Sequence, residues 1–159
     1  MAAIVTYRSD EVFAERFGRT VLNQFEFSLK RTFDIEGYLD YHGMKLARRF
    51  DANSYLRLNR AMDLHDLGRG RGSTEAALAR IRCPSVVAAI RSDGLYPPHQ
   101  QRSLHEGLLA SGLASEFIEV DSPHGHDGFL IDTEQLAPAL SEIVDRGLNE
   151  NVHNRQESR

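Results

Sequence analysis

The chain lacks several features that would commit it to a special environment. Its one cysteine, Cys83, excludes an internal disulfide and cannot by itself form a zinc site, which favours a reducing compartment. The net charge is −4, so the clustered Lys and Arg of a protein that binds nucleic acid or an anionic membrane are missing. No apolar run approaches the roughly 20 residues that span a bilayer, and the N-terminus has no signal-peptide pattern. These absences predict a soluble, cytoplasmic protein without a nucleic-acid or membrane partner.

The composition that is present is that of an ordinary globular chain. Hydrophobic residues make up 41% of the 159 residues, which is typical of soluble domains. A single domain of this length buries roughly 70% of the surface that its unfolded chain exposes. The length therefore predicts one domain with a hydrophobic core.

Helical periodicity dominates the first half of the chain. Ser9 is placed to cap a short helix that ends at Gly18, and Asp34 and Asp51 are placed to cap two longer ones. The link between the longer helices is so short that they should form a hairpin or a sharp bend. Their apolar faces are carried by Ile35, Tyr38, Leu39, His42, Leu46 and Phe50 in the first and by Tyr55, Leu58, Met62 and His65 in the second.

Two stretches of this half allow two interpretations each. Phe25, Phe27 and Leu29 alternate with polar residues, which fits either a short strand or a half-buried loop. The segment Gly68-Arg-Gly-Arg-Gly72 could bind phosphate, but no strand precedes it and its spacing fits neither of the common phosphate-binding motifs. A flexible connection with solvated arginines is the favoured interpretation.

The second half alternates helices and strands. The expected elements are a helix from Thr74 to about Ile81, a strand over 85–90, a helix from Pro97 to Gly112, a strand over 116–120 and a helix capped by Thr133. Residues 84–120 should thus form a βαβ unit with a right-handed crossover. The sides of the last two helices expected to face inward carry Leu104, Leu108 and Leu109, and Leu136, Leu140, Ile143 and Val144. The fold class is α/β.

Polar side chains follow both expected strands. Asp93 comes just after the first, and His126 comes after the second. This order repeats the end of the Ser…Asp…His sequence of α/β-hydrolase triads. Because parallel strands end side by side, about 4.8 Å apart, we expect the Asp93 carboxylate within about 3 Å of the His126 imidazole.

Each of these residues also has a structural interpretation. Asp93 and Asp127 precede glycines and would suit turns. His124 and His126 form a His-x-His pair of the kind that binds metals, although a clear third ligand is missing. Only the combination of Asp93 and His126, in this order, favours catalysis over structure.

Three segments together resemble the carboxyl-terminal half of the homoserine O-acetyltransferases, the acetyl-CoA-dependent acyltransferases of methionine biosynthesis. The segments are Tyr38-Leu39 with Phe50-Asp-Ala-Asn-Ser-Tyr-Leu56, Ser92-Asp-Gly-Leu-Tyr-Pro97, and Asp121-Ser-Pro-His-Gly-His-Asp-Gly-Phe-Leu130. The Gly68–Gly72 segment is similar to that of actinobacterial members. The resemblance covers Thr6 to about Gly147.

The resemblance implies a partial α/β-hydrolase fold. Residues 1–72 would be a helical lid region, residues 73–148 the carboxyl-terminal part of the core, and residues 149–159 a flexible tail. Asp93 and His126 would be the catalytic Asp and His, and Asp127 would bind the homoserine substrate. Acetyl-CoA would be a co-substrate, with no bound cofactor and no metal, and the full-length family implies a homodimer. Tyr38 and Tyr55 have two interpretations, as lining of an acyl channel or as core residues, and aromatic residues at helical spacing are more typical of core packing.

The departure from the family's pattern is the missing nucleophile. No Gly-x-Ser-x-Gly segment occurs in the 159 residues, so this chain lacks the family's nucleophile and is expected to be a fragment: a truncated product, a misassigned start or half of a split protein. Two other classes remain open. One is a non-catalytic interaction module, and the other is a self-contained hydrolase that uses Ser92 or Ser122. The choice between an acetyl and a succinyl donor also stays open.

Overall fold

The computed structural model describes residues 2–22, 31–138 and 140–145, and the chain divides into two compact units, Met1–His65 and Asp66–Arg159. The expected tail and the alternating Phe25, Phe27 and Leu29 lie outside the described residues. The assignment of a lid to residues 1–72 and of a core to residues 73–148 stays a prediction.

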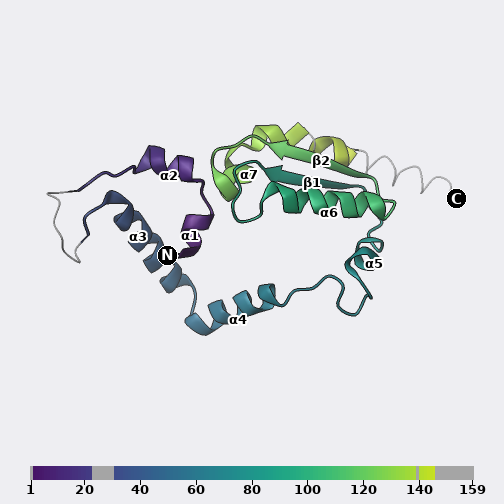
Figure 1. The fold of residues 1–159 in the computed structure, drawn as a ribbon, viewed down its shortest axis with the longest axis horizontal. Coiled ribbons are helices and arrows are strands. Elements are labelled where there is room, and N and C mark those ends of the chain that lie inside the picture. The colour runs from purple at the N-terminus through teal and green to yellow at the C-terminus, as the bar shows by residue number, and fades with distance from the viewer. Residues whose placement is uncertain (1, 23–30, 139, 146–159) are drawn as a thin grey trace. The chain divides into compact units, whose positions relative to one another are not determined.

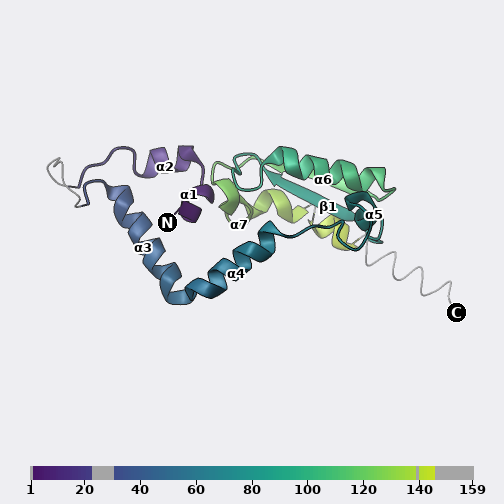
Figure 2. The same ribbon diagram turned by 60° about the horizontal axis from the view of Figure 1, so that its bottom comes forward.

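The first unit is helical. Its helices are α1 (Ala2–Thr6), α2 (Asp10–Arg16), α3 (Asp34–Arg49) and α4 (Ala52–Asp63) (Figure 1). The Ser9 hydroxyl accepts a hydrogen bond from the Val12 amide, and Asp51 Oδ1 accepts from the amides of Asn53 and Ser54, so both predicted caps are confirmed. Figure 2 shows the predicted sharp bend between α3 and α4, where Phe50 and Asp51 make the link.

Helix α3 begins differently from the prediction. Its N-cap is Phe33, and Asp34 is already the first helical residue. The carboxylate that satisfies the exposed amides belongs to Glu36, whose Oε2 accepts from the Thr32 amide at 2.6 Å and from the Phe33 amide at 2.8 Å. A carboxylate in the first turn can reach back to the cap, and it also complements the helix dipole.

Aromatic rings connect α2 to α3. The Tyr38 ring lies 5.1 Å from that of Phe17 and 4.4 Å from that of His42, measured between centroids. The Arg16 guanidinium lies 5.0 Å from the centroid of the Tyr38 ring. Tyr38 is therefore a packing residue within this unit, whereas Tyr55 is exposed on α4.

The second unit is built on a βαβ motif. It contains α5 (Thr74–Leu78), β1 (Ser85–Ile90), α6 (Pro98–Ala110), β2 (Ser115–Val120), the 3₁₀ helix η1 (Gly125–Asp127), α7 (Gly128–Ile131), and a helix over residues 133–138 and 140–145. Strands β1 and β2 pair in parallel, with Ser85 opposite Ser115 and Ile90 opposite Val120. The predicted strands and crossover helix are confirmed, while α5 ends three residues before Ile81.

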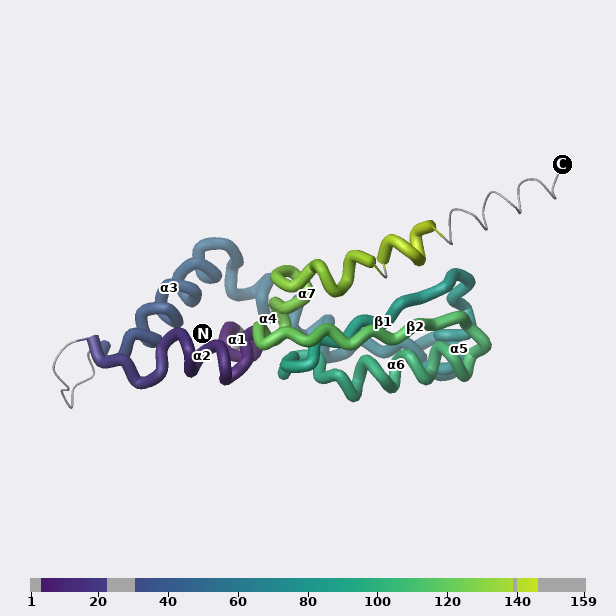
Figure 3. Tube along the Cα trace, turned by 90° about the horizontal axis from the view of Figure 1, so that it is seen from above, coloured from purple at the N-terminus to yellow at the C-terminus, as the bar shows by residue number. Residues whose placement is uncertain are grey.

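The two faces of the sheet are covered by different helices, as Figure 3 shows. On one face Val87 packs with Leu78 and Leu108, and on the other Ile90 and Val120 pack with Leu136. Four predicted inward residues are exposed instead: Leu104, Leu109, Leu140 and Val144. The described sheet has only two strands, so it covers only the helix positions nearest to it. The last helix also starts at Thr133 itself, so Thr133 is not its cap.

Among the described residues, none of the helices combines the length and the apolar character needed to cross a membrane.

The capping carboxylates Glu36 and Asp51 should make the helical content of the chain sensitive to acid. The hydrogen bond from Phe33 and then that from Thr32 lower the pKa of Glu36, and the bonds from Ser54 lower the pKa of Asp51. A lowered pKa stabilises the folded form above the unfolded pKa, and this contribution is lost as the pH falls from the unfolded pKa through the folded pKa. Asp51→Ala should therefore lower the helical circular dichroism at neutral pH and flatten its acid titration. Asp63→Ala, at the opposite end of α4, is the matched control, and an acid titration unchanged by Asp51→Ala would contradict the capping role.

Candidate functional site

Two loops meet at the carboxyl ends of the strands. The Asp93 loop follows β1, and the loop of η1 and α7 follows β2. The last ladder hydrogen bond runs from the Arg91 amide to the Val120 carbonyl at 3.0 Å, directly before both loops. The parallel register therefore brings the two loops side by side.

Asp93 uses both of its carboxylate oxygens. Oδ1 accepts from the amides of Leu95 at 2.8 Å and Tyr96 at 2.9 Å, which holds the turn after β1. Oδ2 lies 2.8 Å from Nδ1 of His126. The residue is only 6% exposed, so water competes little for these bonds. The predicted distance is confirmed, and the turn interpretation is correct as well.

The His126 ring is held on several sides. It lies in η1, with the Tyr96 ring 5.3 Å and the Phe129 ring 5.5 Å from its own, measured between centroids. A carboxylate at Nδ1 stabilises the tautomer that carries its proton there. In that tautomer Nε2 has the lone pair, which is the arrangement that a general base requires.

The loop between β2 and η1 is fixed by side chains that bind its backbone. The Ser92 hydroxyl donates to the Ser122 carbonyl at 2.6 Å and accepts from the Gly125 amide at 2.9 Å. The Gln135 carboxamide both accepts from the amide and donates to the carbonyl of Asp121, each at 3.0 Å. Gly125 has a φ of +66°, a left-handed conformation that favours glycine. These contacts set the path of the chain into His126.

The same contacts bear on the serines considered as nucleophiles. The Ser92 hydroxyl proton is directed at the Ser122 carbonyl. Ser122 is 2% exposed, and its Oγ accepts from the His124 amide. A nucleophile needs an accessible oxygen and a base that takes its proton. These positions weigh against a self-contained hydrolase that uses either serine.

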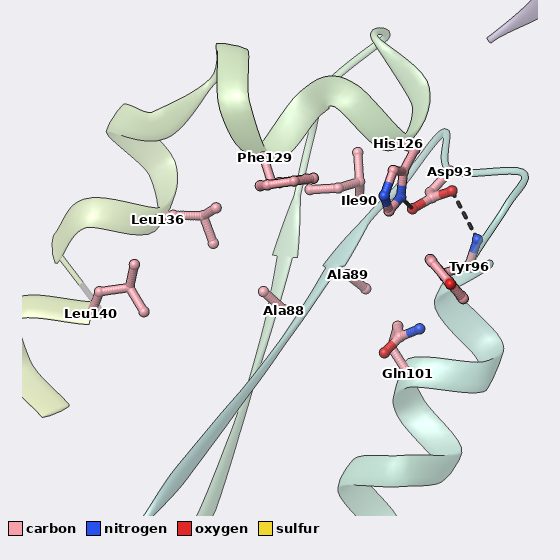
Figure 4. A pocket seen from close by; sticks show the side chains of 10 residues that line it. All are labelled: Ala88, Ala89, Ile90, Asp93, Tyr96, Gln101, His126, Phe129, Leu136 and Leu140. Atoms are coloured by element: carbon pink, nitrogen blue, oxygen red, sulfur yellow. Dashed lines mark hydrogen bonds and ion pairs between the residues drawn. The ribbon is translucent and has the colours of Figure 1, made fainter. Parts of the chain in front are cut away.

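A hollow of about 550 Å³ lies beside the pair. Figure 4 shows Asp93, Tyr96, Gln101 and His126 toward one end of it and Leu136 and Leu140 at the other. The full lining is Ala88, Ala89, Ile90, Asp93, Tyr96, Gln101, His126, Phe129, Leu136 and Leu140. Its apolar end follows β1, and its polar end is formed where the strand finishes.

The other sequence candidates lie apart from this lining. Asp127 is half-buried where η1 passes into α7, and it is not among the residues that line the hollow. His124 is half-buried, and its Nδ1 is enclosed without a hydrogen-bond partner in the described structure. Within the described ranges, no cluster of three or more His, Cys, Asp and Glu side chains is arranged to hold a metal ion.

The sequence did not single out several residues that shape the site. Tyr96, Gln101 and Phe129 line the hollow, and Gly128 allows a close approach of α7 to the sheet. The spacing offers one usable signal, because Tyr96 and Phe129 each lie three residues after a member of the pair, within reach in a turn. The role of Ser92 as a cross-loop bridge has no such local signature.

Comparison with known proteins finds homoserine O-acetyltransferases among the similar sequences, and a homoserine O-acetyltransferase and an esterase among the similar structures. It is 48% identical over 153 residues to the homoserine O-acetyltransferase of Symbiobacterium thermophilum, a match covering 94% of this chain and 39% of that relative. The crystal structure of homoserine O-acetyltransferase from Bacillus anthracis matches 89% of the chain and 38% of its own, with a TM-score of 0.77 at 20% identity. Esterase E22 matches 89% of the chain and 40% of its own, with a TM-score of 0.74 at 21% identity. No protein-family model matches the chain.

The structural likenesses identify the fold, and the sequence likeness identifies the relatives. The described structure is part of an α/β-hydrolase fold, with a helical region and a small parallel sheet. The chain spans about 39% of the length of curated relatives that it matches.

Gly128 offers a direct test of the packing under His126. A Cβ added there would lie 2.7 Å from the Ser122 hydroxyl oxygen and 2.8 Å from Cγ2 of Ile90. Gly128→Ala should therefore lower the free energy of unfolding by about 1–3 kcal/mol, the usual cost of overpacking, measured by urea denaturation. Gly94→Ala, where an added Cβ meets no atom within 4 Å, is the matched control. Equal stability of the two variants would show that α7 does not rest on the sheet as described.

Proposed function

We propose that this chain, a relative of the homoserine O-acetyltransferases, carries the general-base half of an acetyl-transfer site. The complete site would move an acetyl group from acetyl-CoA to the hydroxyl of L-homoserine. The single observation that carries the proposal is the 2.8 Å contact between Asp93 Oδ2 and His126 Nδ1 at the carboxyl end of the parallel strands. Catalytic groups in open α/β sheets occur at this end.

The proposed chemistry has two half-reactions with the same base. In the first, His126 Nε2 removes the proton of a serine hydroxyl, the serine oxygen attacks the thioester carbonyl, and the CoA sulfur leaves with that proton. In the second, Nε2 removes the proton of the homoserine hydroxyl, which attacks the acetyl-serine ester, and the serine oxygen regains the proton. Asp93 would hold the imidazole in the required tautomer and stabilise the imidazolium that forms in each half-reaction.

The serine must come from outside these 159 residues, since they contain no Gly-x-Ser-x-Gly segment. Two features support this division of the site. The chain matches less than two fifths of its relatives' length, and the hollow beside His126 continues along β1 as an apolar surface of Ala88, Ile90 and Leu136. β1 pairs with β2 on one side, and its other edge has no neighbouring strand in the described structure, so further strands could extend the sheet beside this apolar surface.

Asp127 is proposed to bind the substrate. Its carboxylate would form a charge-assisted hydrogen bond with the α-ammonium group of homoserine. Support comes from its position directly after His126 at a partly open turn. Homoserine bound there would need only a short reach to bring its hydroxyl to the imidazole.

The similarity to homoserine O-acetyltransferases also supports proposals for the acyl group, the cellular role and the assembly of the protein. We assign acetyl rather than succinyl as the acyl group because the relatives reported above are named acetyltransferases. We further propose a cytoplasmic role in methionine biosynthesis and assembly as a homodimer, with residues 1–72 as lid and 73–148 as part of the core. The exposed apolar side chains of α3 and α4, among them Tyr41, Met44, Leu56 and Met62, support an assembly role for the lid.

The proposal predicts activity only after complementation. The 159-residue chain alone should release no CoA from acetyl-CoA and homoserine above the uncatalysed rate, because it contributes neither nucleophile nor oxyanion hole. A chimera in which this chain replaces the matching segment of the Symbiobacterium thermophilum enzyme should release CoA in a homoserine-dependent reaction. His126→Ala in the chimera should lower kcat by at least about 10⁴-fold.

His124→Ala is the matched control for that experiment, because His124 lies two residues away and does not line the hollow. It should lower kcat by less than about tenfold, as expected for a residue outside the reacting groups. Release of CoA by the unsupplemented chain, or a chimera indifferent to His126→Ala, would overturn the proposal.

The role of Asp127 is tested by separating the half-reactions. Asp127→Asn in the chimera should raise KM for homoserine about 10- to 100-fold, the usual worth of a hydrogen bond between charged groups, while the initial burst of CoA from acetyl-CoA stays unchanged. Asp121→Asn, which alters an exposed carboxylate paired with Arg91, is the control. An unchanged KM in Asp127→Asn would remove this residue from the substrate site.

A further inference from the structure

Ser92 makes two hydrogen bonds, and both cross between the loops of the site. Its hydroxyl donates to the Ser122 carbonyl at 2.6 Å and accepts from the Gly125 amide at 2.9 Å. Ser92 directly precedes Asp93, and Gly125 directly precedes His126. One hydroxyl group therefore connects the residue before the carboxylate to the residue before the imidazole.

The Ser92 hydroxyl connects the two loops just beyond the last backbone hydrogen bond between β1 and β2. The Arg91 amide still binds the Val120 carbonyl across the strands, but the Asp93 amide turns back to the Ile90 carbonyl of its own chain. Beyond that point backbone groups of β1 no longer face β2 in a regular ladder. The Ser92 side chain continues the connection, with a donor and an acceptor in place of the next rungs.

From this geometry we infer that Ser92 is a positioning residue for the Asp93–His126 pair. It keeps the two loops at the separation at which Nδ1 meets Oδ2, and so maintains the tautomer in which Nε2 can accept a proton. The inference rests on the proposed function for its catalytic meaning, although the structural effect can be measured without any activity.

The surroundings make the hydroxyl difficult to replace. Ser122 is 2% exposed and Gly125 is buried, so neither group released by removal of the Ser92 oxygen is readily solvated. Gly125 also holds a φ of +66°, and the hydrogen bond to Ser92 orients its amide, in the peptide that joins His124 to Gly125, the one before the peptide that leads into His126. Loss of the bond should let η1 shift and should lengthen the contact between Nδ1 and Oδ2.

The test compares substitutions of Ser92 in the ¹⁵N-labelled 159-residue chain. Ser92→Ala removes both bonds, Ser92→Cys keeps the approximate volume with a weak donor and acceptor, and Ser92→Thr keeps the hydroxyl. Ser103→Ala is the matched control, because the Ser103 hydroxyl bonds only within its own helix, to the His99 carbonyl. The two readouts are the ¹⁵N shifts of His126, at a pH where imidazole is neutral, and the exchange rate of the Gly125 amide.

We expect His126 to carry its proton on Nδ1 in the unsubstituted chain, in Ser92→Thr and in Ser103→Ala. In Ser92→Ala and Ser92→Cys the shifts should move toward a mixture of tautomers, and the Gly125 amide should exchange about fivefold to tenfold faster, as for the loss of one hydrogen bond. The cysteine variant keeps the test decisive if the alanine variant fails to fold. In the chimera, either variant should lower kcat with little change in KM for homoserine.

An unchanged tautomer and an unchanged Gly125 exchange rate in Ser92→Cys would overturn the inference. A chimera without any activity would count against the proposed function, while the two spectroscopic readouts would still decide the role of Ser92. Loss of both signatures in Ser92→Thr as well would show that the site depends on serine's size rather than on its hydroxyl, and would also overturn it.

Discussion

The site depends on one buried carboxylate that is shared between two tasks. Oδ1 of Asp93 holds the turn that follows β1, and Oδ2 holds the imidazole of His126. Because the first task fixes the carboxylate plane, the direction of the second bond follows from the fold of the turn. The packing of α6 against β1 and the register of the two strands in turn decide where that turn lies.

Local features of the sequence were enough to predict most of the helices and strands and the pairing of Asp93 with His126. Ser9 and Asp51 cap helices because short polar side chains reach amides two or three residues ahead. Asp93 and His126 could be brought together because parallel strands end at one edge, whatever the details of their loops. The prediction of Asp34 as the cap of α3 was wrong. The first turn has two acidic residues, and the sequence alone does not show that the Glu36 carboxylate is the one that reaches the free amides before the helix.

Burial and orientation could not be predicted in the same way. Leu104 and Leu109 have the helical spacing of core residues but stay exposed, because burial depends on how many strands lie beneath a helix. Ser92 binds Ser122 and Gly125, which follow it by 30 and 33 positions in the sequence. No sequence pattern near Ser92 indicates these partners. Adjacent residues in a tight 3₁₀ turn also point in different directions, so the neighbours of His126 do not share its place in the hollow lining.

The edge of β1 that does not face β2 bears on how the chain associates with other chains. Ser85–Ile90 carries no charged residue, whereas β2 carries Glu116 and Glu119. In the described structure β1 pairs with β2 alone, so one row of its amides and carbonyls has no strand beside it. A flat, uncharged edge is a template for pairing with any passing strand, and natural sheets usually protect such edges with lysine, proline or a bulge. As long as this edge has no strand beside it, the chain is open to aggregation through β1, independently of the chemistry at His126.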